Sequence, residues 1–291
     1  MLALQMSDPH FGTVVPEVAN ALQAMALEQK PDLLLLSGDI TQRATKRQFT
    51  EARAFCDSLQ IAQHLVLPGN HDVPLFNVFK RLFSPYGNHM AAFGPLIEPV
   101  LDTPALLVIG VNTTRWYRHK NGEVSAGQVS RVAAQLRLSG PAQLRVVVTH
   151  QPVHVMKAAD EHDRLRGWEP AVRTWAEAGA DIIMGGHIHL PYVCELSTRM
   201  AGLKRQIWCV QAGTALSSRT RQGMSNSVNL LRYEKAQRGV QCLLERWDFR
   251  PGKGAFEMAH GTPLVLDRNG TLATPKPLQP AENRKIPSRL A

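Results

Sequence analysis

Five short polar motifs in this sequence each follow an apolar run, and their positions constrain the fold more than any other feature. The motifs are Ser7-Asp8-Pro9-His10, Gly38-Asp39, Gly69-Asn70-His71-Asp72, Thr149-His150 and Gly185-Gly186-His187-Ile188-His189. In open α/β sheets, the loops at the carboxyl ends of parallel strands converge on one crevice. We therefore expect the five motifs to meet at one edge of a sheet.

Short apolar runs alternate with helical patterns as far as residue 184, which predicts an α/β layered domain. The predicted strands are Leu2–Met6, Asp32–Leu36, His64–Leu67, Leu106–Val111, Leu144–Thr149 and Asp181–Met184, and the predicted helices cover residues 18–26, 45–59, 129–136 and 169–178. Four more strands follow without an intervening helix, at Tyr192–Glu195, Gln206–Val210, Ser227–Arg232 and Val240–Trp247. We interpret these four as a second sheet packed against the first.

The motif residues are carboxylates, imidazoles and an amide, and no cysteine lies next to them. These groups suit two divalent or trivalent ions of Mn, Fe or Zn, whereas structural zinc sites favour thiolates. In an extended loop, Asp-x-His and His-x-His each place both side chains on one face. Taken singly, Asp8-Pro9-His10 is a common turn and Asp39 a common helix N-cap. The order and strand-end placement of all five motifs favour metal binding.

In this order the motifs resemble those of the calcineurin-like metallophosphoesterase superfamily, over roughly residues 2–250. Residues 7–11 and 69–72 are most similar to the bacterial branch that contains cyclic-nucleotide and glycerophosphodiester phosphodiesterases. The resemblance implies a four-layer sandwich of the α/β class, in which two mixed β-sheets are flanked by helices. It also implies a metal-dependent phosphohydrolase that acts on a small anionic phosphoester.

Carried over to this sequence, the resemblance implies two metal sites that share the Asp39 carboxylate. One ion would be held by Asp8, His10, Asp39 and His189, and the other by Asp39, Asn70, His150 and His187. A hydroxide that bridges the ions would attack phosphorus in line. We expect His71 to protonate the leaving group or to stabilise charge on the phosphate oxygens. Asp72 would orient His71 or close the turn, and the turn role is favoured.

Other enzymes remain open on the sequence alone. A phosphomonoesterase and a nucleotide or UDP-sugar pyrophosphatase are the main alternatives to a phosphodiesterase. A hydrolase of lipid-linked sugars should carry an apolar helical lid. Val73–Phe83 contains Leu75, Phe76, Val78, Phe79, Leu82 and Phe83, which a core helix explains equally well. A catalytically silent scaffold usually lacks a ligand, and none is missing here. A nucleic-acid-binding module rests on charge alone, although the Trp116–Lys120 loop combines aromatic faces with cations.

The composition sets wider limits. The formal charge of +9 suits anionic substrates or simple solubility, and the basic residues are dispersed, which argues against nucleic acid. No run reaches the ~18 apolar residues of a membrane span. Four separated cysteines predict reduced thiols and a cytoplasmic protein. We expect a catalytic domain over residues 1–262 and a Pro-rich basic tail over 263–291; a homo-oligomer is compatible with the sequence.

Overall fold

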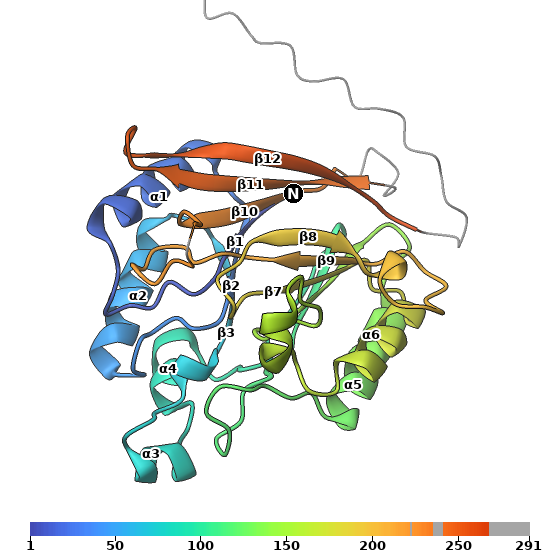
Figure 1. Ribbon diagram of the computed structural model, residues 1–291, viewed down its shortest axis with the longest axis horizontal. Helices are drawn as coiled ribbons and strands as arrows, with labels where there is room; N and C mark the ends of the chain where they lie inside the picture. The colour runs from blue at the N-terminus through green and yellow to red at the C-terminus, as the bar shows by residue number, and fades with distance from the viewer. Residues whose placement is uncertain (222, 235–240, 268–291) are drawn as a thin grey trace, which may run out of the picture.

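Two mixed six-stranded sheets pack face to face at the centre of the computed structural model, which describes residues 1–221, 223–234 and 241–267 (Figure 1). The first sheet has the order β12-β11-β10-β1-β2-β3 and comprises β1 (Leu2–Met6), β2 (Leu33–Ser37), β3 (Gln63–Leu67), β10 (Ser227–Arg232), β11 (Gln241–Arg250) and β12 (Ala255–Val265). The second has the order β4-β5-β6-β7-β9-β8 and comprises β4 (Val100–Asp102), β5 (Leu106–Gly110), β6 (Leu144–Val148), β7 (Ile182–Gly185), β8 (Tyr192–Glu195) and β9 (Trp208–Gln211).

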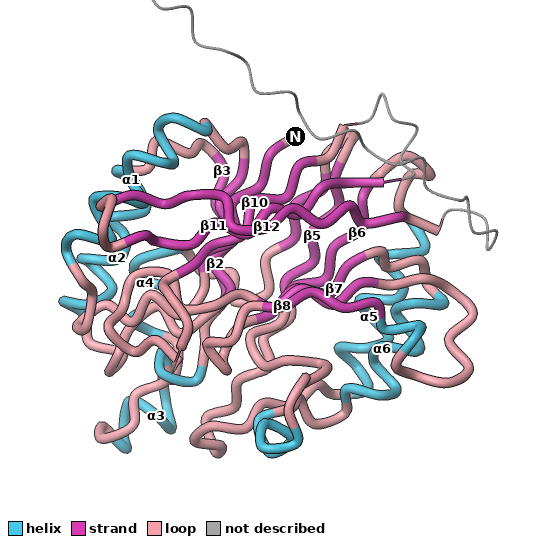
Figure 2. Tube along the Cα trace, turned by 45° about the horizontal axis from the view of Figure 1, so that its top comes forward, coloured by secondary structure: helices cyan, strands magenta, loops and turns pink. Residues whose placement is uncertain are grey.

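Helices cover the outer face of each sheet. Helices α1 (Pro16–Gln29) and α2 (Lys46–Ser58) pack on the first sheet, and α5 (Ala126–Leu138) and α6 (Trp168–Glu177) pack on the second. Figure 2 shows the two helix pairs on opposite sides of the sheets. This confirms the predicted four-layer sandwich.

The continuous apolar run of β2 follows from burial on both faces of its sheet. Leu34 and Leu36 pack in the core beneath α1 and α2, whereas Leu33 and Leu35 pack in the core between the two sheets. Strands β1, β2 and β3 pair in parallel, as do β5, β6, β7 and β9. Their carboxyl ends therefore point to one rim of the sandwich.

The predicted assignment of the last four strands to a separate sheet is wrong. Strands β8 and β9 extend the second sheet, whereas β10 and β11 pair beside β1 in the first. In the first sheet, β1, β2 and β3 form one half and β10, β11 and β12 the other, whereas β9 and β8 complete one side of the second sheet. Hydrophobic spacing does not encode this partition, because all of these strands have a similar apolar face.

Strand β12 is absent from the prediction and crosses the expected domain boundary. It ends at Val265, and the Leu264 side chain is buried between the sheets, so the packed chain extends beyond residue 262. Within the predicted tail, residues 268–291 lie outside the described part. Cys194 and Cys209, although 15 positions apart in the sequence, face each other in the β8–β9 pair, and all four cysteines are buried. No helix among the described residues is long and apolar enough to cross a membrane.

The segment Val73–Phe83 does not form a core helix. Only its second half is helical, as α3 (Val78–Phe83), which is followed by α4 (Gly87–Phe93). Phe76, Phe79 and Phe83 each expose at least 75% of their surface, and α3 projects from the body of the protein (Figure 1). The core-helix interpretation is therefore wrong, and these apolar side chains face solvent.

Candidate metal centre

The strand ends bring all seven predicted metal ligands to one rim. Asp8 and His10 follow β1, Asp39 follows β2 and Asn70 follows β3. His150 follows β6, and His187 and His189 follow β7 of the other sheet. The rim thus lies where the two sheets meet, and each sheet contributes ligands to it.

One cluster contains Asp8, His10 and His189, whose ligand atoms lie within 4.8 Å of one another. His189 Nε2 is 3.2 Å from Asp8 Oδ1 and 3.1 Å from His10 Nε2. His10 Nε2 is also 3.9 Å from Asp39 Oδ2. These three side chains bring imidazole and carboxylate donor atoms close together, as a metal coordination site requires.

A second cluster contains Asp39, His150 and His187. His150 Nε2 lies 3.3 Å from Asp39 Oδ1 and 3.2 Å from Asn70 Oδ1, which adds the amide to this group. The two oxygens of Asp39 therefore face different clusters, Oδ2 toward His10 and Oδ1 toward His150. This is the arrangement that a bridging carboxylate requires.

The backbone is held in an uncommon conformation at five of the seven ligands. Their φ angles are positive: 51° at Asp8, 44° at His10, 49° at Asp39, 75° at His187 and 54° at His189. Residues with a side chain seldom adopt this left-handed region, and they do so chiefly where the surrounding structure enforces it at a functional site. The strained backbone at these positions turns the five side chains toward the site.

Unsatisfied buried atoms at the site also fit metal ions. Asp8 Oδ1 and both ring nitrogens of His187 are buried and have no hydrogen-bond partner among the described residues. Leaving such atoms unpaired costs free energy, which coordination to a cation would recover. The donor set and these orphaned atoms therefore fit a pair of metal ions.

Two glycines allow the motif backbones to approach one another. A Cβ atom on Gly69 would lie 2.0 Å from the Asp39 backbone nitrogen, and one on Gly186 would lie 1.9 Å from Ser7 Oγ. Any side chain at either position would push apart two loops that carry ligands. The glycines before Asn70 and His187 are thus required by close packing between loops.

Residues 1–191 of the chain match the calcineurin-like phosphoesterase family. The chain belongs to this family. Among curated relatives, a probable cyclic nucleotide phosphodiesterase of Synechococcus sp. (strain WH7803) is 29% identical over 214 residues, which cover 64% of this chain and 73% of the relative.

Solved structures support the fold of this metallophosphoesterase. A dimetal phosphatase from Danio rerio has a TM-score of 0.66 and 12% identity, with 92% of this chain and 99% of that one covered. The purple acid phosphatase of yellow lupin (Lupinus luteus) seeds has a TM-score of 0.69 and 11% identity, with 91% of this chain and 53% of that one covered. The chain therefore spans about half the length of the lupin protein.

The charge state of His150 couples metal binding to pH in the metallophosphoesterase. Burial lowers the pKa of this imidazole, but the Asp39 and Asp8 carboxylates and the Ser37 carbonyl together outweigh burial and raise the pKa to about 9. At pH 7 the metal-free protein therefore carries a proton on His150, which an ion must displace. We expect the affinity for Mn²⁺ to rise about tenfold per pH unit up to roughly pH 9 and then to level off.

Calorimetric titration of metal-free protein with Mn²⁺ at pH 7 measures this exchange. Two buffers with different ionisation enthalpies should reveal proton release on metal binding, to which His150 contributes about one proton and His189, whose pKa Asp8 also raises, contributes further. Binding with no proton release, or an affinity that does not change between pH 7 and pH 9, would contradict the protonated state of His150.

Asp72 closes the motif turn. Its carboxylate accepts hydrogen bonds from the backbone N–H groups of Gly69, Ile40 and Thr41 at 2.8–3.0 Å, and from Thr41 Oγ1 at 2.8 Å. These contacts tie the loop after β2 to the loop after β3. No hydrogen bond between the Asp72 and His71 side chains is present among the described residues, so the contacts match the turn role.

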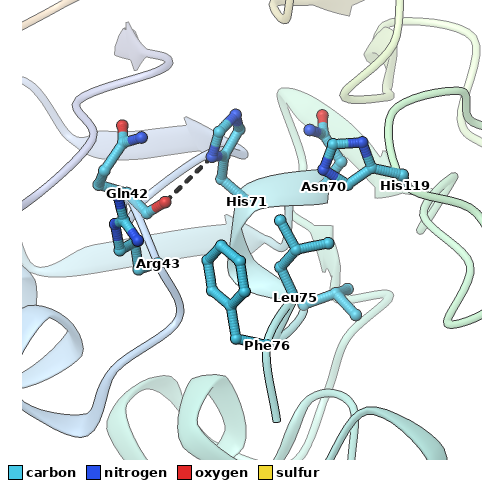
Figure 3. A pocket seen from close by; sticks show the side chains of 8 residues that line it. Gln42, Arg43, Asn70, His71, Leu75, Phe76 and His119 are labelled. Carbon is cyan, nitrogen blue, oxygen red and sulfur yellow. Dashed lines mark hydrogen bonds between the residues drawn. The ribbon is translucent and has the colours of Figure 1, made fainter. Parts of the chain in front are cut away.

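His71 lies at the mouth of the site with its tautomer fixed by the backbone. His71 Nδ1 is 3.0 Å from the Gln42 carbonyl oxygen, and Figure 3 shows this hydrogen bond. Because a carbonyl can only accept, Nδ1 carries the proton and Nε2 faces the site. The His71 backbone N–H also donates to Asp39 Oδ1 at 2.8 Å. The residue therefore holds the shared carboxylate through its main chain and offers its side chain to the pocket.

Two charged residues of the site are absent from the sequence prediction. Arg219, in the loop between β9 and β10, reaches His71 Nε2 with its Nη1 at 3.2 Å. Asp163 lies 3.5 Å from His187 Nε2 and 2.7 Å from Lys120 Nζ. His187 and Lys120 lower the pKa of Asp163 to about 2 against the opposing effect of burial. Neither residue follows a strand directly, so the strand-end rule could not find them.

Proposed function

We propose that this chain hydrolyses small phosphodiesters, with 3′,5′-cyclic nucleotides as the leading substrate class. The two ions would be Mn, Fe or Zn, held by Asp8, His10, Asp39, Asn70, His150, His187 and His189. The observation that carries the proposal is the position of Asp39, whose two oxygens face the two ligand clusters. The probable cyclic nucleotide phosphodiesterase among the relatives supports the choice of substrate class.

When bound, a pair of ions lowers the pKa of water toward neutrality and neutralises charge on phosphoryl oxygens. The chain supplies the surroundings for this chemistry. Asp39 is oriented by the backbone N–H of His71, and His189 by a hydrogen bond from its Nδ1 to the Arg219 carbonyl oxygen at 2.6 Å. With a proton on Nε2 as well, His71 would serve the leaving group or the phosphate oxygens, because the ring lines the same cavity as Asp39 and Asn70.

The cavity beside the ligand clusters has the size for a small anion. It encloses about 580 Å³, and its lining includes Arg219 as well as four of the proposed ligands, Asp39, Asn70, His187 and His189. The formal charge of +9 adds a long-range attraction for anionic substrates. A homo-oligomer and a cytoplasmic location stay predictions.

A second candidate is a pyrophosphatase that acts on a nucleotide or sugar with an apolar group. A smaller pocket of about 130 Å³ adjoins His71 and is lined by Val73, Leu75 and Phe76 (Figure 3). The exposed apolar side chains of α3, which follows Phe76 in the sequence, add to this apolar surface. This surface suits a hydrocarbon chain, whereas a cyclic nucleotide does not need one.

Hydrolysis of bis-p-nitrophenyl phosphate and p-nitrophenyl phosphate with added Mn²⁺ tests the reaction class. We expect faster release from the diester, followed by turnover of cyclic nucleotides in a wider panel. Faster release from the monoester would contradict the phosphodiesterase assignment. In the same panel, preference for an acylated UDP-sugar over its deacylated form, with no turnover of cyclic nucleotides, would favour the second candidate.

A further inference from the structure

Arg219 places a cation against the proposed reaction site. It lies in the loop after β9 and lines the same cavity as Asp39, Asn70 and His71. Its Nη1 atom is 2.9 Å from Gln42 Oε1, 3.2 Å from His71 Nε2 and 3.3 Å from His10 Nδ1. The guanidinium group is thus fixed beside a metal ligand and beside the residue proposed to serve the leaving group.

The charge of Arg219 is not neutralised within the described part of the chain. Its side-chain partners there are an amide oxygen and two imidazole nitrogens, all without negative charge in their neutral forms. Arg221, two positions further on, instead forms a two-pronged ion pair with Asp160 at 2.9 and 3.0 Å. Of these two arginines, only Arg219 keeps its charge for an anion from outside the chain.

The hydrogen-bond chemistry also directs Arg219 toward the cavity. His71 has its proton on Nδ1, so its Nε2 can accept from Arg219. A His10 ring that binds an ion through Nε2 carries its proton on Nδ1 and cannot accept from Arg219. In the metal-replete protein, the two hydrogens of Arg219 Nη1 would therefore go to Gln42 Oε1 and His71 Nε2. Arg219 Nη2 and Nε have no hydrogen-bond partner among the described residues, and a phosphate oxygen in the cavity would accept from them.

We propose that Arg219 is a catalytic residue that binds a non-bridging oxygen of the substrate phosphate on the side of His71. This inference rests on the proposed function and adds a contact to the substrate from a residue that is not a proposed metal ligand. A planar guanidinium offers two parallel N–H donors to phosphate, which an ammonium group does not. Arg219 thus recognises the phosphoryl group itself, whichever alcohol is esterified to it.

The test compares Arg219→Ala, Arg219→Lys and wild-type protein, all metal-replete. Binding of inorganic phosphate is measured by calorimetry, hydrolysis of bis-p-nitrophenyl phosphate by absorbance, and bound metal by elemental analysis. We expect Arg219→Ala to weaken phosphate binding and to lower kcat/KM, each about 10- to 100-fold, with bound metal unchanged. Arg219→Lys should fall between Arg219→Ala and wild type. Arg47→Ala removes one charge from an exposed ion pair on α2 and is the control for net charge, with no change expected.

Unchanged phosphate affinity in Arg219→Ala would overturn the assignment, as would metal loss in proportion to the loss of activity. If Arg47→Ala had an equal effect, net charge alone would explain the weaker binding, and the assignment of Arg219 would also be overturned. If wild-type protein hydrolyses no phosphoester, the proposed function fails. The phosphate titration would still decide whether Arg219 binds the anion, so the two failures are distinguishable.

Discussion

Replacement of Asp39 by Ala is expected to release both metal ions and to lower phosphodiester hydrolysis at least about 10³-fold. The reason is the shared position of this carboxylate, with Oδ1 toward His150 and Oδ2 toward His10. Loss of any other ligand removes a donor from one cluster, whereas loss of Asp39 removes a donor and a negative charge from both. Elemental analysis of metal-replete protein and hydrolysis of bis-p-nitrophenyl phosphate measure the two effects.

Two further variants separate coordination from folding. Asp39 has a φ of 49°, a conformation that Asn tolerates better than Ala. Asp39→Asn should therefore keep the loop shape while removing the charge, and it should bind less metal than wild type but more than Asp39→Ala. Asp57→Ala, at an exposed ion pair with Arg53 on α2, should leave metal content and activity unchanged. A folded Asp39→Ala protein that still holds one ion per chain would contradict the shared carboxylate.

The five polar motifs could be placed at one rim from sequence because each follows an apolar run, and the choice of seven ligands within them came from the resemblance to the family. Ile182 to Met184 and Leu33 to Leu36 are buried on both faces, so their strands are visible as continuous apolar runs, and the polar residues after them mark the rim. Within each sheet, convergence then needs no knowledge of which strands are neighbours. All parallel strands of a sheet deliver their carboxyl ends to the same side.

Arg219 could not be found in this way. It is 148 positions from His71 in the sequence, and it lies eight residues beyond the end of β9 at Gln211. The role proposed for Arg219 depends on its having no carboxylate partner among the described residues, since Asp160 pairs with Arg221 instead. Two arginines two positions apart look equivalent in the sequence, and only the packed loops distinguish them.

Strand β12 was missed, and the core-helix interpretation of the α3 segment was wrong, for different physical reasons. β12 is an edge strand that contains Gly261 and Pro263, and most of its side chains are partly or fully exposed, so it lacks the apolar run of a central strand. The α3 segment has the opposite pattern, apolar residues without burial. Apolar content predicts burial only when a partner surface exists, and the described chain offers none over Phe79 and Phe83.

His71→Ala is expected to lower turnover of phosphodiesters about 10²-fold or more while the two ions stay bound. Metal retention follows from the main chain, because the His71 backbone N–H that holds Asp39 Oδ1 survives the substitution. What is lost is the imidazole, whose Nε2 faces the cavity beside Arg219. Turnover of a saturating 3′,5′-cyclic nucleotide and metal content of the same preparation measure the two quantities separately.

His260→Ala serves as the matched control, since His260 is exposed on β12 and lies in no ligand cluster among the described residues. It should leave both quantities unchanged. Parallel loss of metal and turnover in His71→Ala would make this side chain a structural support of the metal centre. Loss of turnover with full metal content would instead assign the His71 side chain to the reacting phosphate, and a substrate whose leaving group needs no proton would then show which role it has.

If His71 protonates the leaving group, the defect should shrink for p-nitrophenolate, which leaves without a proton, and grow for an alkoxide of a cyclic nucleotide. If His71 stabilises charge on the phosphate oxygens, the defect should be similar for both substrates, because that charge does not depend on the leaving group.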